Sequence, residues 1–374
     1  MNAYSFGRRE LASLATVALL APALRLFPST GAELAGRGGW LSALLAALPV
    51  LAYLWFVSLL MGARQDGENL QELTLRLLGP AAGRAALILT ALWLLLYGGF
   101  ILRAGADRLI VTIYPNADPG GFSIVMGLLA LISALGSARS LIRVARMTQP
   151  VVLGSLAIIL FFSFFSVKRE NLLPLTAADA LPVLEGSLGA VNIMSLGVYA
   201  VCFLEGGTPK TPGRFRAFAL WAVSFSLLLC LIIGAIIGGY SAELTAELTR
   251  PFGVLVRNLV FFRTIERVEA LVVMLWIFPD FLLSSLLLCA AQRSLRLALG
   301  KPADYGGQGP MDFSHGRWLI WLCATAMILC ALFIAPDSQS LSLWSLELIP
   351  TLNMLYAFAV LPLIYIVGKL RKTL

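Results

Sequence analysis

Long apolar segments, separated by short groups of charged residues, recur along the whole chain. A helix that crosses the hydrocarbon core of a bilayer needs about 20 largely apolar residues. Ten segments of the 374-residue chain meet this requirement, at approximately 11–28, 39–62, 85–113, 121–137, 147–167, 187–204, 217–240, 268–291, 318–335 and 348–368. The pattern predicts an all-α integral membrane protein in which residues 1–374 form a single polytopic domain of about ten transmembrane helices.

The composition agrees with a surface that faces lipid. Hydrophobic residues make up 59% of the chain and charged residues only 13%, whereas a soluble domain carries about 25% charged residues. The formal net charge is +8, but the Lys and Arg residues lie in short groups between apolar segments. This is the distribution of a membrane protein with a positive cytoplasmic side, and it argues against nucleic acid as a partner.

The same charges predict an orientation. If the N-terminus is cytoplasmic, every segment predicted to face the cytoplasm carries at least two Lys or Arg residues, from Arg8 and Arg9 to Lys369 and Arg371. We therefore expect both ends on the cytoplasmic side of the cytoplasmic membrane. A cleavable secretory signal is the alternative interpretation of the first segment, and Arg25 argues against it because it interrupts the apolar stretch.

Ten spans divide into two halves of five with opposite orientation. Halves at approximately 1–170 and 171–374 would form the 5+5 inverted repeat of many transporters. Between spans seven and eight, the segment 241–267 mixes apolar and charged residues at helical spacing. It predicts one or two amphipathic helices on the external surface.

The first span of each half contains residues that weaken a helix. Ala21-Pro22-Ala23 lies in span one, and Gly197-Val198-Tyr199 lies in span six. Pro22 cannot donate a backbone hydrogen bond, and Gly197 is a weaker helix breaker. We expect helices one and six to be broken near the membrane midplane, where exposed backbone groups bind a small ligand. Kinked packing helices are the alternative, because Gly and Pro are common in membrane spans.

Several segments resemble the spore germination permeases, the B subunits of nutrient germinant receptors. The external segment before span six contains Asn171-Leu172-Leu173-Pro174-Leu175 and Leu181-Pro182-Val183-Leu184-Glu185-Gly186. The start of span eight, 266–277, reads Glu-Arg-Val-Glu-Ala-Leu-Val-Val-Met-Leu-Trp-Ile, and Leu78-Gly79-Pro80 precedes span three. The resemblance follows the order and length of nearly the whole chain.

This resemblance implies a LeuT-like fold of the amino acid–polyamine–organocation transporter superfamily. It also implies nutrient sensing in the spore inner membrane, beside a receptor A subunit and a lipoprotein C subunit. The chain departs from the family at Ala21-Pro22, where Gly and a small polar residue are usual, and at Arg25, where an apolar residue is usual. The nutrient would then differ from the small amino acids associated with the family, or the site would be degenerate.

Ionisable residues within spans are costly unless they are paired or hydrated. Arg25 is a candidate for binding a ligand carboxylate, with snorkelling to the surface as the alternative. Asp280 could pair with Arg25, carry a proton or line the cavity, and Arg103 and Asp107 have the i,i+4 spacing of a local ion pair. By the resemblance, Tyr97, Ser284 and Ser285 face the break of helix one. The predicted substrate-binding residues are Ala21, Pro22, Ala23, Arg25, Tyr97, Gly197, Val198, Tyr199, Asp280, Ser284 and Ser285.

The sequence contains no pattern that is typical of catalysis or of a bound cofactor. No nucleophile elbow, phosphate-binding loop or metal-ligand spacing is present, and the five cysteines form no C-x-x-C pair. We therefore expect a protein that is not an enzyme and that holds neither a metal nor a cofactor. Membrane lipid and a small nutrient such as an amino acid are the expected partners, and a proton-coupled amino-acid permease is the alternative function. A purely structural membrane scaffold is the third possibility, if the site at Ala21-Pro22 is closed.

Overall fold

The computed structural model describes residues 7–65, 68–112, 117–136, 138–204, 214–248, 250–258, 268–301, 317–335 and 337–371. Within these ranges the regular secondary structure is entirely helical, which agrees with the predicted fold class. Seven helical segments of the described residues are long and apolar enough to cross a membrane, and the helices Pro119–Ala134 and Trp318–Phe333 are shorter but apolar.

Each of the ten predicted spans overlaps one long helix or one chain of shorter helices. The long helices are α1 (Arg8–Ala35), α5 (Pro80–Thr112), α6 (Pro119–Ala134), α7 (Ala138–Ser163), α8 (Ala180–Leu204), α9 (Arg214–Tyr240), α12 (Val268–Ala298) and α13 (Arg317–Phe333). The second span consists of α2 (Gly39–Leu45) and α3 (Ala47–Gly62). The last consists of α14 (Ser338–Leu343), α15 (Ile349–Leu355) and α16 (Leu361–Leu370), joined by π-helical turns at Trp344–Leu348 and Tyr356–Val360.

Short helices lie between the spans. They are α4 (Leu70–Leu78), α10 (Ala242–Glu247) and α11 (Pro251–Asn258). Single 3₁₀ turns occupy Gly36–Gly38, Phe164–Ser166, Arg169–Asn171 and Ala177–Asp179. The described part of the predicted segment 241–267 thus forms two helices, and its remainder from 259 lies outside the described residues.

Helices α1 and α8 are continuous over their full length, so the predicted breaks do not appear as interruptions. Pro22 and Pro28 both lie inside α1. A proline removes one backbone hydrogen bond, and membrane helices tolerate this loss where neighbouring helices surround them. Ala21 and Ala23 are each 1% exposed, and their small side chains leave room for the Pro22 ring in a packed helix.

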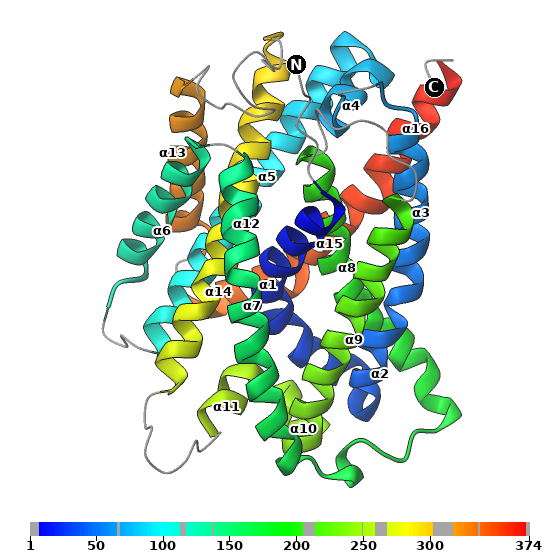
Figure 1. Cartoon of the computed structure of the whole chain (residues 1–374), viewed down its shortest axis with the longest axis vertical. Coiled ribbons are helices and arrows are strands. Elements are labelled where there is room, and N and C mark those ends of the chain that lie inside the picture. Colours follow the sequence, from blue (N-terminus) through cyan, green and yellow to red (C-terminus); the bar gives the residue numbers. More distant parts are fainter. Residues whose placement is uncertain are drawn as a thin grey trace.

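Helix α1 lies inside the bundle, whereas other helices form its flanks (Figure 1). Leu14, Leu19 and Phe27 of α1 are completely buried, and α1 packs against α8, α12 and α7. In contrast, Ile132 of α6 and Phe161 of α7 are 65% and 61% exposed. Large apolar side chains on a surface of this kind fit contact with lipid tails.

The two ends of the bundle carry different short helices (Figure 1). Helix α4 and the C-terminal end of α16 lie at one end, which we call the α4 end. Helices α10 and α11 lie at the opposite end, which we call the α10 end. Gly79 adopts a positive φ of 82° between α4 and α5, a conformation that glycine adopts at little cost, and it allows α4 to fold back on the bundle.

Candidate functional site

Arg25 places a guanidinium group inside the bundle. Its carbon Cζ lies 4.7 Å from the centroid of the Phe100 ring on α5. All three guanidinium nitrogens are buried, and none has a hydrogen-bond partner. The ring face attracts the positive charge but offers no hydrogen-bond acceptor in the plane of the guanidinium. Arg25 therefore keeps its donors available for another group.

Asp280 of α12 provides a buried carboxylate that interacts electrostatically with Arg25. It is 2% exposed, and its Oδ2 lies 3.4 Å from a terminal nitrogen of Arg108 on α5. The two groups form an ion pair, but neither carboxylate oxygen has a partner in hydrogen-bond geometry. Electrostatic interaction also links Asp280 to Arg25. One carboxylate is thus shared between two guanidinium groups.

The contact between α5 and α12 depends on glycines of α5. A Cβ on Gly105 would lie 3.1 Å from Oδ2 of Asp280, and a Cβ on Gly98 would lie 3.8 Å from Leu287. The two helices are antiparallel, so this register puts Ser284 at the level of Phe100. Ser284 is completely buried and its Oγ has no hydrogen-bond partner.

Glycines of α8 allow the close contact between α1 and α8. A Cβ on Gly197 would lie 2.2 Å from Leu19, and one on Gly189 would lie 3.1 Å from Phe27. This antiparallel register puts residue 192 of α8 opposite residue 25 of α1. Asn192 is 3% exposed and its Oδ1 lacks a hydrogen-bond partner. Gly197 itself is a close packing contact between the two helices.

The two registers thus bring four buried groups without hydrogen-bond partners to neighbouring levels of the bundle. They are the guanidinium of Arg25, the amide oxygen of Asn192, the hydroxyl of Ser284 and the carboxylate of Asp280. Native proteins pair nearly all buried polar groups, so such a gathering demands a cause. The groups come from α1, α8 and α12, and Arg25 and Asp280 both lie against α5. We call this set the four-helix site.

Tyr97 lies next to this site, on the same face of α5 as Phe100. It is 2% exposed, and its ring stacks between those of Trp93 and Phe100, with centroid distances of 5.6 Å and 6.1 Å. Electrostatic interaction connects its phenol to Arg25 and Asp280. The rings of Trp93, Tyr97 and Phe100 form an apolar wall that runs along α5 from the four-helix site towards the α4 end.

The remaining predicted site residues have other roles in the structure. Ser285 Oγ donates a 2.8 Å hydrogen bond to the Phe281 carbonyl one turn earlier. Tyr199 donates a 2.5 Å hydrogen bond to Tyr356, whose hydroxyl lies 3.1 Å from Thr90 Oγ1. Ala21, Pro22, Ala23 and Val198 are buried in helix contacts. The structure thus brings together Arg25, Tyr97, Asp280 and Ser284, and it places Tyr199 in a separate hydroxyl cluster.

Arg103 and Asp107, expected to neutralise each other on α5, both reach other elements. Arg103 Nε donates a 2.8 Å hydrogen bond to the Ala335 carbonyl, and Asp107 pairs with Arg250. The i,i+4 spacing is local, whereas these partners are far away in sequence. Glu205, an ionisable residue at the end of the sixth predicted span, lies outside the described residues.

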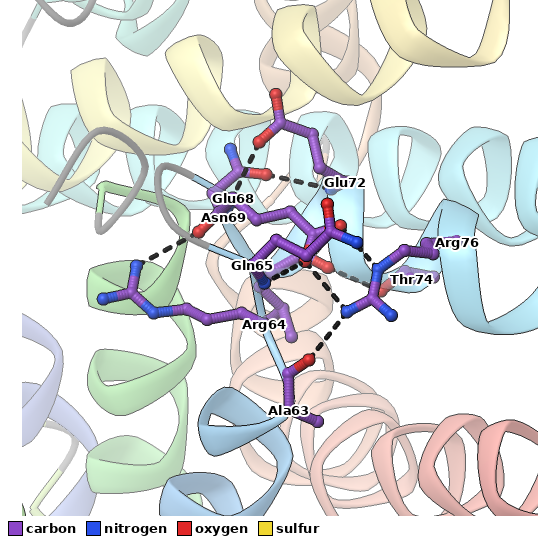
Figure 2. Close-up of polar contacts among 9 residues, drawn as sticks. Ala63, Arg64, Gln65, Glu68, Asn69, Glu72, Thr74 and Arg76 are labelled. Atoms are coloured by element: carbon purple, nitrogen blue, oxygen red, sulfur yellow. Dashed lines mark hydrogen bonds and ion pairs between the residues drawn. The ribbon is translucent and has the colours of Figure 1, made fainter. Parts of the chain in front are cut away.

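A second polar network, at the α4 end, is not predicted by the sequence analysis (Figure 2). Arg76 of α4 pairs with Glu68 at 2.8 Å and donates a 2.7 Å hydrogen bond to the Ala63 carbonyl. Arg64 is only 1% exposed and donates to the Glu68 carbonyl at 3.1 Å. These bonds hold the connection between α3 and α4 in one conformation.

A capping box starts α4 in this network. The side chain of Asn69 accepts a hydrogen bond from the Glu72 backbone, and Glu72 accepts one from the Asn69 backbone, each at 2.9 Å. Two of the N–H groups that a helix start leaves unpaired are thereby satisfied. The sequence signature is Asn followed by Glu three residues later, before an apolar stretch.

The network also ties α4 to α8 and α12, two of the three helices that carry polar atoms of the four-helix site. Asn69 Nδ2 lies 3.5 Å from the Phe203 carbonyl at the end of α8. Gln71 donates to the Ala290 carbonyl and to Ser294 Oγ on α12, both at 2.8 Å. Glu72 pairs with Arg293 of α12 at 3.3 Å. We call this set of contacts the α4 network.

Within the described residues, no group of three or more His, Cys, Asp or Glu side chains could hold a metal ion. The four-helix site offers one carboxylate, one guanidinium group, an amide and a hydroxyl, and the guanidinium of Arg108 lies beside its carboxylate. This chemistry suits the binding of a small polar molecule by charge and hydrogen bonds.

The arrangement defines a class: a helical membrane protein with the LeuT-like transporter fold. Two solved transporters are among the structures that share it. The nucleobase–cation symporter Mhp1 in a closed conformation with bromovinylhydantoin bound is 13% identical, with a TM-score of 0.65 over 96% of this chain and 77% of that one. A sodium-coupled sialic acid symporter in an outward-open, substrate-bound state is 12% identical, with a TM-score of 0.55 over 93% and 79%.

The family is also defined. The pattern of the spore permease family, described as spore germination protein, matches residues 8–338, and the chain belongs to this family. No curated protein matches the chain in sequence. The resemblance inferred from the sequence is confirmed, and the chain is an integral membrane protein of the permease type related to spore germination.

Proposed function

We propose that the chain is the ligand-sensing membrane subunit of a nutrient germinant receptor in the spore inner membrane. In this proposal it binds an amino acid or a similar small nutrient in the four-helix site. The observation that supports it is the gathering of buried, unpartnered polar groups from Arg25, Asn192, Ser284 and Asp280. Membership of the spore germination family supports the biological setting.

The energetic argument is that these groups are costly to bury alone. An unsatisfied buried polar group costs about 1–3 kcal/mol, and more when it is charged. The Arg25 guanidinium offers five N–H donors in a fixed planar arrangement that matches a carboxylate. A nutrient carboxylate on Arg25, with a polar group between Asn192 and Ser284, would recover this energy on binding.

The proposed signal is a change in the relative positions of α8 and α12. Both helices carry atoms of the four-helix site, and both are tied to α4 at Phe203, Ala290 and Arg293. A nutrient can shift a conformational equilibrium only if it binds one state more tightly than another. Ligation that draws α8 and α12 together would disturb the α4 network, and an A subunit and a lipoprotein C subunit would respond to that change.

A proton-coupled amino-acid permease is the second candidate function. Both structural neighbours are symporters, and the neighbour Mhp1 shows that this fold can enclose a small ring compound. Asp280 is a buried carboxylate of the kind that carries protons in membrane transporters. In this alternative, the same site would bind the substrate and Asp280 would exchange a proton during the transport cycle.

Reconstitution distinguishes the two functions. The purified chain in liposomes should bind its nutrient but accumulate little of it, with or without a proton gradient. Asp280→Asn should then change affinity or folding without removing any gradient-driven flux. Robust proton-driven uptake by the chain alone, abolished by Asp280→Asn, would contradict the sensor and establish the permease.

A further inference from the structure

We infer that the four-helix site selects small ligands with a net negative charge, such as an acidic amino acid or a hydroxy acid, over neutral zwitterions. The inference rests on the proposed function, because it assigns the charge of the nutrient that the site binds. The evidence is the guanidinium of Arg25, which has no hydrogen-bond partner, and the ion pair that engages the carboxylate of Asp280 with Arg108.

Arg25 and Arg108 share the carboxylate of Asp280. That carboxylate pairs with Arg108 at 3.4 Å and also interacts electrostatically with Arg25. Asp107, the other carboxylate whose charge acts on Arg25, forms an ion pair with Arg250. The three buried nitrogens of Arg25 have no hydrogen-bond acceptor, which leaves this guanidinium for a carboxylate of the ligand.

Asp280 is poorly placed to serve a ligand ammonium. Its Oδ2 faces Arg108 at 3.4 Å, and Gly105 brings the α5 backbone against the same oxygen. An ammonium that approached Asp280 would also approach Arg108 and Arg25, and like charges at short distance repel strongly where the dielectric is low. A zwitterion would therefore gain binding free energy at its carboxylate and lose part of it through repulsion at its ammonium.

A second negative charge, or the absence of an ammonium, removes this conflict. A carboxylate on Arg25 completes a charge-assisted, two-point contact. Asn192 Oδ1 and Ser284 Oγ, both neutral and unpartnered, can then bond a hydroxyl or an amine of the ligand. An acidic amino acid supplies an additional carboxylate, and an α-hydroxy acid supplies a hydroxyl in place of the ammonium.

Binding to the full-length protein in lipid nanodiscs tests the inference with pairs that match in shape and differ in charge. The pairs are L-aspartate and L-asparagine, L-glutamate and L-glutamine, and L-lactate and L-alanine, measured by isothermal titration calorimetry at neutral pH. We expect the anionic member of at least one pair to bind about tenfold or more tightly than its neutral partner, which corresponds to 1.4 kcal/mol.

Two variants locate the preference. Arg25→Gln should reduce the ratio of affinities for the anionic and neutral ligands to below about threefold. Arg37→Gln removes the same charge from an exposed position. This control should leave the ratio unchanged because solvent screens that charge. Equal or tighter binding of the neutral members would overturn the inference while the proposed function stands. Binding of none of the six compounds would also overturn the inference, and the reconstitution experiment above would still decide the proposed function independently. The measurements on the unaltered protein decide the inference even if Arg25→Gln does not fold.

Discussion

Arg25 lies with its guanidinium carbon 4.7 Å from the ring centroid of Phe100, and its buried nitrogens donate to no acceptor. The interaction with the ring compensates only part of the desolvation of a guanidinium. Because the unliganded protein bears this cost, we expect Arg25→Met to raise its thermal stability, by about 1–3 kcal/mol. Thermal unfolding of the purified protein without nutrient measures the effect.

The matched control for this prediction is Arg76→Met. Arg76 has an ion pair with Glu68 and a hydrogen bond to the Ala63 carbonyl, so its removal leaves partners unsatisfied and should lower the stability. A loss of stability in Arg25→Met as large as that in Arg76→Met would mean that Arg25 is a structural residue.

Tyr356 connects two helices through its hydroxyl, which bonds both Tyr199 and Thr90. We expect Tyr356→Phe to reduce the free energy of unfolding by about 1–3 kcal/mol, because it leaves two buried groups with fewer partners. Tyr53→Phe is the control, since the buried Tyr53 hydroxyl has no hydrogen-bond partner, and it should be neutral or stabilising. Chemical denaturation of the two variants in the same detergent compares them, and equal losses would refute the assignment.

The ion pair between Glu72 of α4 and Arg293 of α12 should couple the two helices. In a double-mutant cycle with Glu72→Gln and Arg293→Met, we expect an interaction energy of about 0.5–3 kcal/mol. Glutamine at 72 still accepts the hydrogen bond from the Asn69 backbone, so the helix cap survives and the cycle isolates the contact with α12. Additive losses would show that α4 is not held to α12 through this pair.

Asp337, outside the spans, makes the start of α14 sensitive to pH. Hydrogen bonds from Ser340 hold the pKa of its carboxyl below the ordinary value of 3.8. A lowered pKa in the folded state stabilises the protein above the ordinary pKa, and this contribution is lost as the pH falls through the lowered value. Amide exchange at the start of α14 should therefore accelerate at acid pH. In Asp337→Asn the acceleration should disappear, and its persistence would identify another titrating group.

The long apolar segments predicted where the helices of the bundle lie because lipid imposes a length and a composition on each helix separately. The continuity of α1 through Pro22 was not predictable in this way. Pro22 removes a single hydrogen bond, and whether the helix continues depends on how closely α8 and α12 surround it, which is tertiary information.

The candidate site was predictable in part. A charged residue within a span, such as Arg25 or Asp280, stands out in a sequence because its burial is costly. Arg108 is also a charged residue within a span, but its pairing with Asp280 follows only from the register of α5 against α12. Asn192 gives no signal, since an amide in a span usually bonds its neighbours. The α4 network joins Gln71 to Ser294, which are separated by 223 residues, and of all its contacts only the capping box at Asn69 has a sequence signature.

The central claim is that a nutrient contacts Arg25 and Ser284, and the adjacent serines of α12 test it most directly. The measurement is the nutrient concentration that gives half-maximal germination of spores carrying Ser284→Ala, Ser285→Ala or Arg25→Lys at equal membrane abundance. Loss of a hydrogen bond worth about 0.5–1.5 kcal/mol should raise this concentration roughly 2- to 12-fold in Ser284→Ala. Arg25→Lys should raise it about tenfold or more, because lysine cannot form the two-point contact with a carboxylate. Ser285→Ala should leave it unchanged, since that hydroxyl bonds the Phe281 carbonyl. Unaltered responses in both Ser284→Ala and Arg25→Lys would show that the nutrient binds elsewhere.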